Sequence, residues 1–331
     1  MKNTKEAHWK DTILPMLPQK LERLLSPIED EYPLEELRIR AGQPLQLCSS
    51  LGDRLLYAAG KRPAATIEDC AAIFERVCGH SIYAWEDEIK NGFVTLAGGC
   101  RVGVCGRAVR DERGSIAHIS DITSINFRVG RACVGAANLL LPRVLRPDGA
   151  PYAALIVSAP GHGKTTILRD MVRQLSYGYG GACPQRVCVI DERMEISGSV
   201  RGAPQFDLGP RTDVLCGSGK PEGIRLAVRT LSPQVIATDE LGSLQDANAV
   251  QEAAFSGVTV IATAHVDSVQ ALKKRRTLMK LIESGALERI VQLGRSSGRP
   301  GIITGVWDGE LRPVANKGRE VLCFDCSQSL E

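Results

Sequence analysis

The chain has 331 residues, a formal net charge of +3 and 44% hydrophobic residues. These are the proportions of an ordinary globular protein, and the length allows two domains that each bury a core. No apolar run approaches the roughly 18 residues that span a membrane, and the opening MKNTKEAHWKDT lacks the apolar core of a signal peptide. We therefore expect a cytoplasmic protein, and so small a charge does not by itself indicate a nucleic-acid partner.

The cysteine content argues against a disulfide framework. The 11 cysteines are odd in number and scattered along the chain, and their default state in the cytosol is reduced. Cys323 and Cys326 form one CxxC pair near the end. A zinc site needs four ligands and no second pair is near, so we expect these thiols to have no metal role.

Residues 1–128 mix short helical and strand patterns. The stretch Leu37–Leu47 alternates about a Gly-Gln-Pro turn, which predicts two strands of a hairpin. The stretch Thr66–Asp69 resembles a capping box that opens a helix through Cys78. Two more alternating runs flank Gly98-Gly99, a two-residue hairpin signal. We therefore predict a small α+β domain.

Residues 129–150 contain Pro142, Pro147 and an Asp-Gly pair, and we predict that they form a linker or hinge. From residue 151 to residue 331 the pattern changes to buried strands separated by helical stretches. The apolar strand runs after the first are Val187–Ile190, Val235–Thr238 and Thr259–Thr263. This pattern predicts an α/β domain with a mainly parallel sheet and helices on both faces.

The first strand of that domain leads into AALIVSAPGHGKTTILRD, residues 153–170. An apolar strand, a loop of small residues and an amphipathic helix follow one another, as in a phosphate-binding P-loop. In such a loop, backbone N–H groups and the helix N-terminus bind phosphate, Lys164 reaches the outer phosphates and Thr165 holds Mg²⁺. The alternative is a chance glycine-rich loop between a strand and a helix.

Ser158 departs from the pattern G-x-x-x-x-G-K-[ST], which places glycine at that position. Glycine relieves a tight turn because it accepts a positive φ. The serine can therefore serve only where residue 158 keeps a negative φ.

Two acids, Asp239 and Glu240, end the strand Val235–Thr238. In P-loop NTPases such a strand is expected beside the P-loop strand, where its terminal carboxylate helps hold Mg²⁺. We assign Asp239 to the metal shell and Glu240 to the general base that polarises the attacking water. The alternative is a strand end with two solvated acids.

Two other strand ends carry polar residues. Asp191, Glu192 and Glu195 follow the strand that ends at Ile190, and His265 ends the strand that begins at Thr259. Ligands of open α/β sheets bind at the carboxyl ends of strands, where these segments converge. A single histidine of this kind is more often a hydrogen-bonded surface or core residue. The four strand ends together indicate a hydrolytic site.

The motifs GHGKTT, IDERME, LSPQVIATDE and TVIATAH resemble, in order and rough spacing, the Walker A, Asp-box, Walker B and His-box motifs of secretion ATPases. Those are RecA-like motors, often hexameric, of type II and type IV secretion and pilus systems. ELRIRAGQPL, SIYAWEDEIKNGFVTLAGGCRVGVCGRAV, and RTDVLCG followed by VRTLSP are similar to the stage III AA family of sporulation ATPases, which serve a channel between mother cell and forespore. The resemblance covers roughly Leu37 to Leu293.

This resemblance implies a RecA-like P-loop NTPase core behind the α+β domain, with ATP and Mg²⁺ as ligands. It also implies a homo-oligomer, a hexamer, that docks on membrane-embedded channel or secretion proteins and is thereby held at the membrane from the cytoplasm. A nucleic-acid partner is not expected.

Carried over by position, the resemblance implies a role for each motif residue. Glu240 would activate water, Glu195 with Glu192 would order water or nucleotide, and His265 would sense the γ-phosphate. Asp239 would reach Mg²⁺ through water. The nucleotide contacts would be Ser158, Ala159, Pro160, Gly161, His162, Gly163, Lys164, Thr165 and Thr166.

Hydrolysis also needs positive charge on the transferred phosphoryl group, often an arginine from a neighbouring subunit or domain. The first candidates are Arg229 and Arg101, followed by Arg107 and Arg128. A basic run, Lys273–Arg276, is either a solvated surface or a contact for acidic partners or phosphates.

Two other functions stay open. One is a nucleic-acid-dependent RecA-like ATPase, which the few aromatic residues and the absence of a recognisable nucleic-acid-binding module disfavour. The other is a nucleotide-binding scaffold without turnover, which rests on the departure at Ser158.

Overall fold

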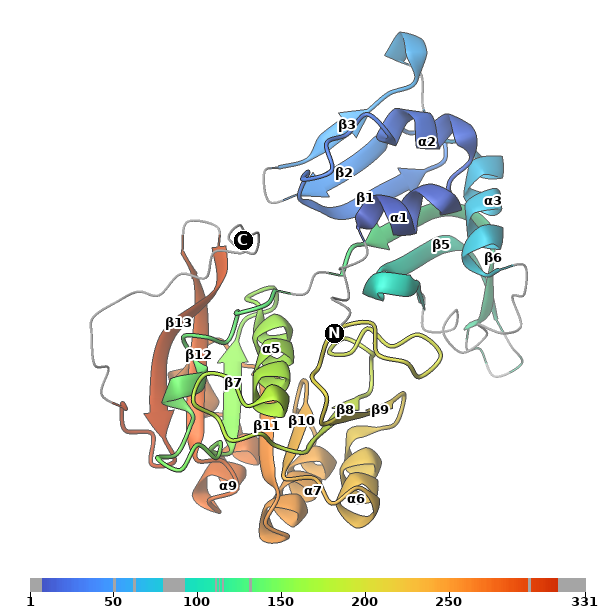
Figure 1. Ribbon diagram of the computed structural model, residues 1–331. Helices are drawn as coiled ribbons and strands as arrows, with labels where there is room; N and C mark the ends of the chain where they lie inside the picture. Colours follow the sequence, from blue (N-terminus) through green and yellow to red (C-terminus); the bar gives the residue numbers. More distant parts are fainter. Residues whose placement is uncertain are drawn as a thin grey trace. The chain divides into compact units, whose positions relative to one another are not determined.

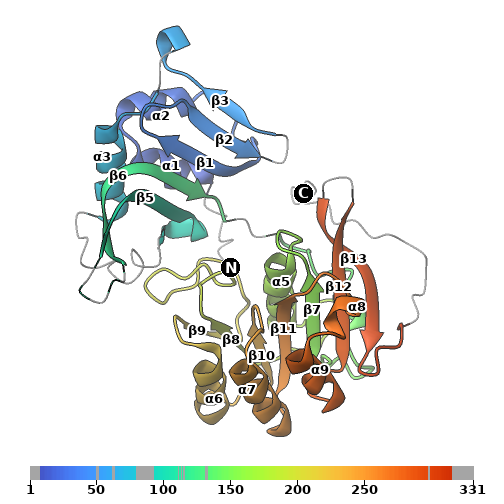
Figure 2. The ribbon, with the colours of Figure 1, turned by 180° about the vertical axis from the view of Figure 1, so that it is seen from behind.

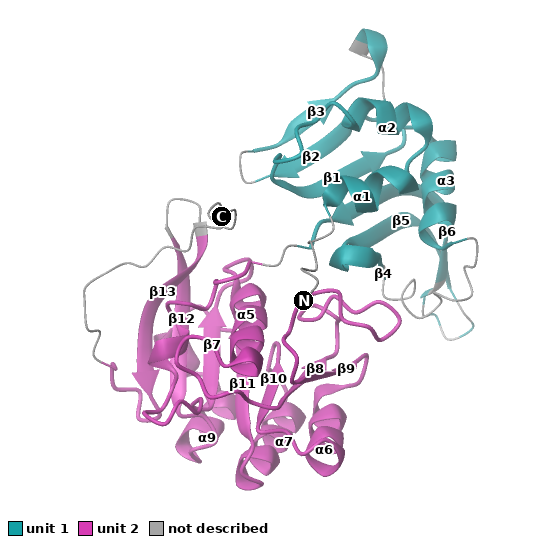
Figure 3. Ribbon diagram, in the orientation of Figure 1, with its two compact units in different colours: residues 1–131 teal, residues 132–331 magenta. Residues whose placement is uncertain are grey.

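The computed structural model describes residues 8–49, 52–61, 64–79, 93–110, 112, 114, 116–130, 133–296 and 299–314. The chain divides into two compact units, residues 1–131 and residues 132–331, each with a sheet of its own (Figure 3). The pair Cys323 and Cys326 lies outside the described residues. Within them, no helix is both long enough and apolar enough to cross a membrane.

Unit 1 is an α+β domain whose described strands form one antiparallel sheet in the order β3-β2-β1-β6-β5-β4 (Figure 1). Its helices and 3-10 turns are α1 (Trp9–Ile13), η1 (Leu14–Met16), α2 (Gln19–Leu25), η2 (Ala59–Lys61), α3 (Ile67–Val77) and η4 (Ala97–Gly99). Its strands are β1 (Leu34–Arg40), β2 (Leu45–Ser49), β3 (Arg54–Leu56), β4 (Phe93–Thr95), β5 (Arg101–Arg110) and β6 (Ile116–Arg128).

The local predictions for this unit are confirmed, with one correction. Strands β1 and β2 form the predicted hairpin, and α3 begins at a capping box in which Thr66 and Asp69 bind each other's backbone N–H. Strands β4 and β5 also pair. Their turn has three residues rather than two, because Leu96 N still donates to Cys100 O across the pair, 2.7 Å away.

Unit 2 is the predicted α/β domain, and its described strands form one sheet in the order β13-β12-β7-β11-β10-β8-β9 (Figures 1 and 2). All neighbouring pairs are parallel except β12 and β13. The strands are β7 (Ala154–Ser158), β8 (Val187–Asp191), β9 (Thr212–Cys216), β10 (Val235–Thr238), β11 (Thr259–His265), β12 (Arg289–Ser296) and β13 (Arg299–Asp308). The helices and 3-10 turn are η5 (Leu141–Arg143), α5 (Lys164–Tyr177), α6 (Lys220–Thr230), α7 (Leu244–Phe255), α8 (Val269–Leu272) and α9 (Arg276–Glu283).

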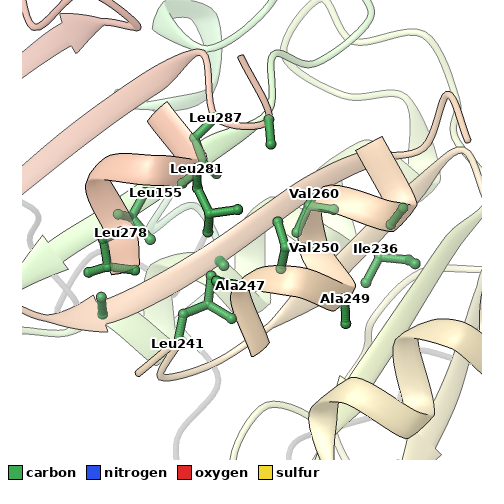
Figure 4. Close-up of a cluster of buried hydrophobic side chains, with 14 of the residues drawn as sticks. Leu155, Ile236, Leu241, Ala247, Ala249, Val250, Val260, Leu278, Leu281 and Leu287 are labelled. Carbon is green, nitrogen blue, oxygen red and sulfur yellow. The ribbon is translucent and has the colours of Figure 1, made fainter. Parts of the chain in front are cut away.

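Strand alternation divides the core of unit 2 between the two faces of the sheet. Ile156 of β7 packs in the cluster that contains the apolar side of α5. Leu155 and Val157, its neighbours in the strand, pack in the cluster formed with α6, α7 and α9 (Figure 4). Because successive side chains of a strand point to opposite faces, one short apolar run serves both clusters. The inner strands β7, β8 and β10 are therefore buried on both faces of the sheet.

The order of the strands corrects one prediction. We expected the strand that ends in Asp239 beside the P-loop strand. Instead β11 lies between them, pairing with β7 on one side and with β10 on the other. His265 at the end of β11 therefore lies between the P-loop and Glu240.

The linker prediction for residues 129–150 also needs correction. The division into units falls at residue 131. Beyond it, Ala137, Leu140 and Val144 are fully buried in the same cluster as α5. The backbone N–H of Ala137 also donates to the buried carboxylate of Asp170, 2.8 Å away. Most of the predicted linker is therefore part of the core of unit 2.

The basic run Lys273–Arg276 does not lie within one helix. It spans the break between α8 and α9, and all four residues are exposed. This agrees with a solvated surface and leaves a contact with acidic partners untested.

Candidate functional site

The loop between β7 and α5 has the backbone of a phosphate-binding turn. Gly161 and Gly163 have φ values of 73° and 81°, in the left-handed region that favours glycine. Ser158 is instead the last residue of β7, fully buried and outside that region. The condition for serine at this position is met, and its hydroxyl donates to Ala159 O at 2.9 Å. The departure from the usual motif therefore causes no backbone strain.

Lys164 begins α5 and is withdrawn into the protein. Its ammonium donates to the carbonyls of Ser158 and Ala159, each 3.1 Å away, and to His265 Nδ1 at 3.0 Å. Burial lowers the pKa of Lys164, and the charges of Glu240 and Asp267 oppose that shift. All three ammonium protons thus have neutral acceptors, which a phosphate group can replace without leaving a carboxylate unpaired.

His265 connects this lysine to the acid at the end of β10. A lysine ammonium only donates, so Nδ1 of His265 must accept, and the ring proton lies on Nε2. From there it donates to Glu240 Oε1 at 2.6 Å. Arg193 donates to the other carboxylate oxygen of Glu240 at 3.0 Å. A continuous chain of hydrogen bonds therefore joins the P-loop lysine to the predicted general base.

The backbone of Glu240 is held in an unusual conformation. Its φ of 43° lies in the left-handed region, which costs a side-chain-bearing residue about 1 kcal/mol or more. The hydroxyl of Thr263, buried in β11, accepts the N–H of Glu240 at 2.9 Å and fixes this turn. Burial by itself would raise the pKa of Glu240, but His265 and Arg193 outweigh it and the pKa is lowered. The group is therefore ionised at neutral pH.

Asp239 is the most exceptional side chain of the site. It is only 1% exposed, and neither carboxylate oxygen has a hydrogen-bond partner among the described residues. Burial raises its pKa to about 6, against the opposing charge of Lys220. Unpaired buried carboxylate oxygens are costly unless a cation uses them.

These residues fit Mg²⁺ as P-loop proteins bind it. Mg²⁺ takes oxygen ligands and is usually held by one or two protein groups together with phosphate oxygens and water. The orphaned oxygens of Asp239 and the half-buried hydroxyl-bearing Thr165 are such groups. The described residues hold no cluster of three His, Cys, Asp or Glu side chains that would bind a metal alone. Asp239 and Thr165 would supply only part of the six oxygen ligands of Mg²⁺, and phosphate oxygens and water would supply the rest.

The three acids at the carboxyl end of β8 have different roles. Asp191 is fully buried and accepts four hydrogen bonds from the turn that follows, from the N–H groups of Glu195, Ile196 and Ser197 and from the Ser197 hydroxyl. It is a structural residue. Glu192 pairs with Lys220, whose Nζ lies 2.5 Å from its Oε2. Glu195 is half-buried, and its charge lies close enough to Asp239 to raise the pKa of Asp239.

The two arginines predicted to act on phosphate belong to different units. Arg229 lies on the exposed C-terminal end of α6, nine residues from Lys220, or about 13 Å along the helix. It lines a surface cavity between α6 and α7. Arg101 belongs to unit 1, where its guanidinium lies 4.8 Å from the ring centre of Phe93.

Sequence reasoning missed two charged residues of the site, Lys220 and Arg193. Nothing in the sequence apart from its place in IDERME indicates a role for Arg193. The position of Lys220 does indicate one, because a lysine that follows a glycine and begins a helix is disfavoured by the helix dipole.

The family model for sporulation stage III protein AA matches residues 7–312. Stage III sporulation protein AA of Bacillus subtilis is 38% identical over 298 residues, which span 89% of this chain and 94% of that protein. The chain belongs to the stage III sporulation protein AA family. The resemblance noted in the sequence motifs is thereby confirmed.

Solved structures with a similar fold include a pilus retraction motor and a bacterial ATPase. The pilus retraction motor PilT with bound ADP has a TM-score of 0.55 at 16% identity, over 85% of this chain and 78% of that chain. The ATPase DotB of Legionella pneumophila has a TM-score of 0.51 at 15% identity, over 89% and 77%. At these identities the likeness shows the fold alone, which this chain shares with the ATPase DotB and the motor PilT.

Proposed function

We propose that the chain is a Mg²⁺-dependent ATPase and that it works as a ring-forming motor, energising a sporulation or secretion channel at a membrane from the cytoplasmic side. The observation that carries this proposal is the hydrogen-bonded chain from Lys164 through His265 to Glu240. A phosphate-binding lysine linked to an ionised glutamate suits hydrolysis, because it couples binding to the base that would activate water. A binding scaffold has no need of that link.

In this proposal ATP binds at the loop from Ser158 to Thr166, and Lys164 exchanges its carbonyl acceptors for phosphate oxygens. His265 then loses the donor on Nδ1. The His265 ring then turns its Nε2–H from Glu240 toward the γ-phosphate, and this bond forms only while that phosphate is present. Glu240, released from His265, accepts a proton from the attacking water.

Asp239 and Thr165 would hold Mg²⁺, which neutralises charge on the phosphates. Glu195, beside Asp239, and Glu192 would order water or nucleotide.

The fold relatives support this assignment. One of them is named an ATPase and another a pilus motor with bound ADP. Transfer of the phosphoryl group also needs a further positive charge, often supplied by an arginine of a neighbouring subunit or domain. In this proposal Arg229 or Arg101 supplies that charge within a ring of six subunits. A nucleotide-dependent hexamer in light scattering would support this; a monomer with and without ATP analogue would oppose it.

The decisive test is hydrolysis of Mg-ATP by the full chain. Replacing Lys164 by Ala removes the phosphate-binding cation, and we expect nucleotide affinity to fall at least 100-fold with loss of turnover. Lys273→Ala, in the exposed basic run, is the matched control and should hydrolyse ATP as the wild type does. Unchanged affinity in Lys164→Ala would overturn the P-loop assignment. Strong stimulation by single-stranded DNA or RNA would favour the nucleic-acid-dependent alternative.

A further inference from the structure

Lys220 occupies an unusual position for a lysine. It is the first residue of α6, where the helix dipole disfavours a cation. It is also only 6% exposed, and so buried a lysine is expected only where it has a charged partner. A residue placed against a local preference in this way is expected where it serves a function.

The surrounding chain fixes Lys220 closely. Gly223, one turn further along α6, lies so near β8 that an added Cβ would be 2.8 Å from Ile190 Cγ2 and 2.6 Å from Ser218 Oγ. The N–H of Gly217 donates to Asp191 O at 3.2 Å, which ties the loop before α6 to the end of β8. The start of α6 is thereby held at the carboxyl end of the strand that carries the acids.

The ammonium of Lys220 lies between two carboxylates from different strands. It is 2.5 Å from Glu192 Oε2 and 3.8 Å from Asp239 Oδ1. The second distance is too long for a hydrogen bond, so both oxygens of Asp239 stay unpaired among the described residues. The lysine thus compensates the charge of Asp239 and leaves its ligand oxygens open.

We propose that Lys220 is a positioning residue of the metal–nucleotide site, which holds Glu192 beside Asp239 and keeps the Asp239 oxygens directed to an incoming Mg²⁺. The inference rests on the proposed function and deepens it. If Lys220 merely repelled the ion, its removal would lower the Mg²⁺ requirement. As a positioning residue it acts in the other direction, because without it two neighbouring carboxylates repel each other and the buried one loses its compensating charge.

The test measures binding of a fluorescent ATP analogue to the full chain, first in EDTA and then during titration with Mg²⁺. In Lys220→Met we expect metal-free affinity within about twofold of the wild type, because the P-loop is untouched. The Mg²⁺ concentration for half of the metal-dependent signal should rise about 10- to 100-fold, the usual cost of removing a residue that supports a metal ligand. Lys220→Arg, which keeps the charge, should recover most of this loss.

Glu192→Gln provides a second route if Lys220→Met does not fold. It removes the partner of Lys220 at an exposed position, and we expect a shift in the same direction but smaller. Lys274→Met is the control for loss of a lysine elsewhere. A Mg²⁺ requirement that is unchanged or lower in both Lys220→Met and Glu192→Gln would overturn the proposal. If the wild type itself shows no Mg²⁺-dependent nucleotide binding, the proposed function fails. If the wild type shows it and both variants have the same Mg²⁺ requirement, only the proposed role of Lys220 fails.

Discussion

The starts of α5 and α6 present the same residue in opposite surroundings. Lys164 and Lys220 each follow a glycine, each occupy the first position of their helix, and are 5% and 6% exposed. Lys164 lies against two backbone carbonyls and an imidazole, whereas Lys220 lies against the carboxylates of Glu192 and Asp239. One ammonium has neutral partners and the other has charged ones.

The partners of the two ammonium groups predict that Lys164 is a mobile cation and Lys220 a fixed one. Bonds to neutral acceptors contribute little net free energy, so Lys164 can exchange them for a phosphate group. Bonds to carboxylates are stronger, and breaking a buried ion pair leaves a charge uncompensated. Position in a helix and burial are therefore not enough to assign a lysine to phosphate binding. The partners of the ammonium decide the role.

The largest effect should come from Glu240, where the chain of hydrogen bonds from Lys164 ends. Glu240→Gln keeps the shape but cannot accept a proton, so we expect the ATP hydrolysis rate to fall 10²- to 10⁴-fold. Nucleotide affinity should stay within a few-fold, because Lys164 keeps its place. Steady-state hydrolysis at saturating ATP and a binding titration measure the two quantities.

Glu310→Gln is the matched control for this variant. Glu310 follows β13, where it forms an exposed ion pair with Arg312. Its loss should leave the hydrolysis rate unchanged. A Glu240→Gln protein with the wild-type rate would remove Glu240 from the mechanism and would reduce the hydrogen-bonded chain to a structural feature.

Local signals in the sequence were enough to predict the strand, loop and helix on the α5 side of the site. The strand, the glycines with positive φ and the helix after Lys164 all lie within one stretch, and the structure agrees with them. The capping box at Thr66 was found in the same way. Each of these features depends on residues a few positions apart, so a single sequence contains the information.

The α6 side depends on pairings between distant segments. The sequence predicts Asp191 as part of an acidic site, but its carboxylate accepts hydrogen bonds from the turn that ends at Ser197. Lys220 meets Asp239 only because β8 and β10 are neighbours in the sheet. The position of β11 between β7 and β10 could not be predicted from the sequence either, because packing across the whole domain sets the strand order. Sequence alone therefore found the acids but not the cation among them.

A second prediction concerns the cost of the buried acid on the α6 side. Burial raises the pKa of Asp239 to about 6 in the folded protein. Above about pH 6 the buried carboxylate is charged and lowers the free energy of unfolding. This destabilisation decreases as the pH falls toward the pKa that the carboxyl group has in the unfolded chain. Two pKa units correspond to about 3 kcal/mol. Asp239→Asn without metal should therefore raise the free energy of unfolding by about 2–3 kcal/mol at pH 8 and by much less at pH 4.5.

Urea denaturation in EDTA at the two pH values measures this difference. Asp213→Asn, at an exposed position of β9, is the control and should show no comparable gain. A gain for Asp239→Asn that is equal at both pH values would mean that the buried charge is not its source. No gain at all would mean that Lys220 compensates Asp239 fully, and the contrast between the two helix starts would be weaker than the distances suggest.

The smallest effect is expected on the α5 side, at the position where the chain departs from the usual motif. Ser158→Gly restores the expected glycine, but residue 158 ends β7 without a positive φ, so glycine has nothing to relieve there. It should cost about 0.5–1 kcal/mol of stability through the greater freedom of the unfolded chain. Nucleotide affinity should change less than twofold, because Lys164 is held mainly by the carbonyls of Ser158 and Ala159, which glycine keeps. An affinity gain of tenfold or more would show that the serine hydroxyl, 3.4 Å from the Lys164 ammonium, restrains that lysine, and the cation that we describe as mobile would be partly fixed after all.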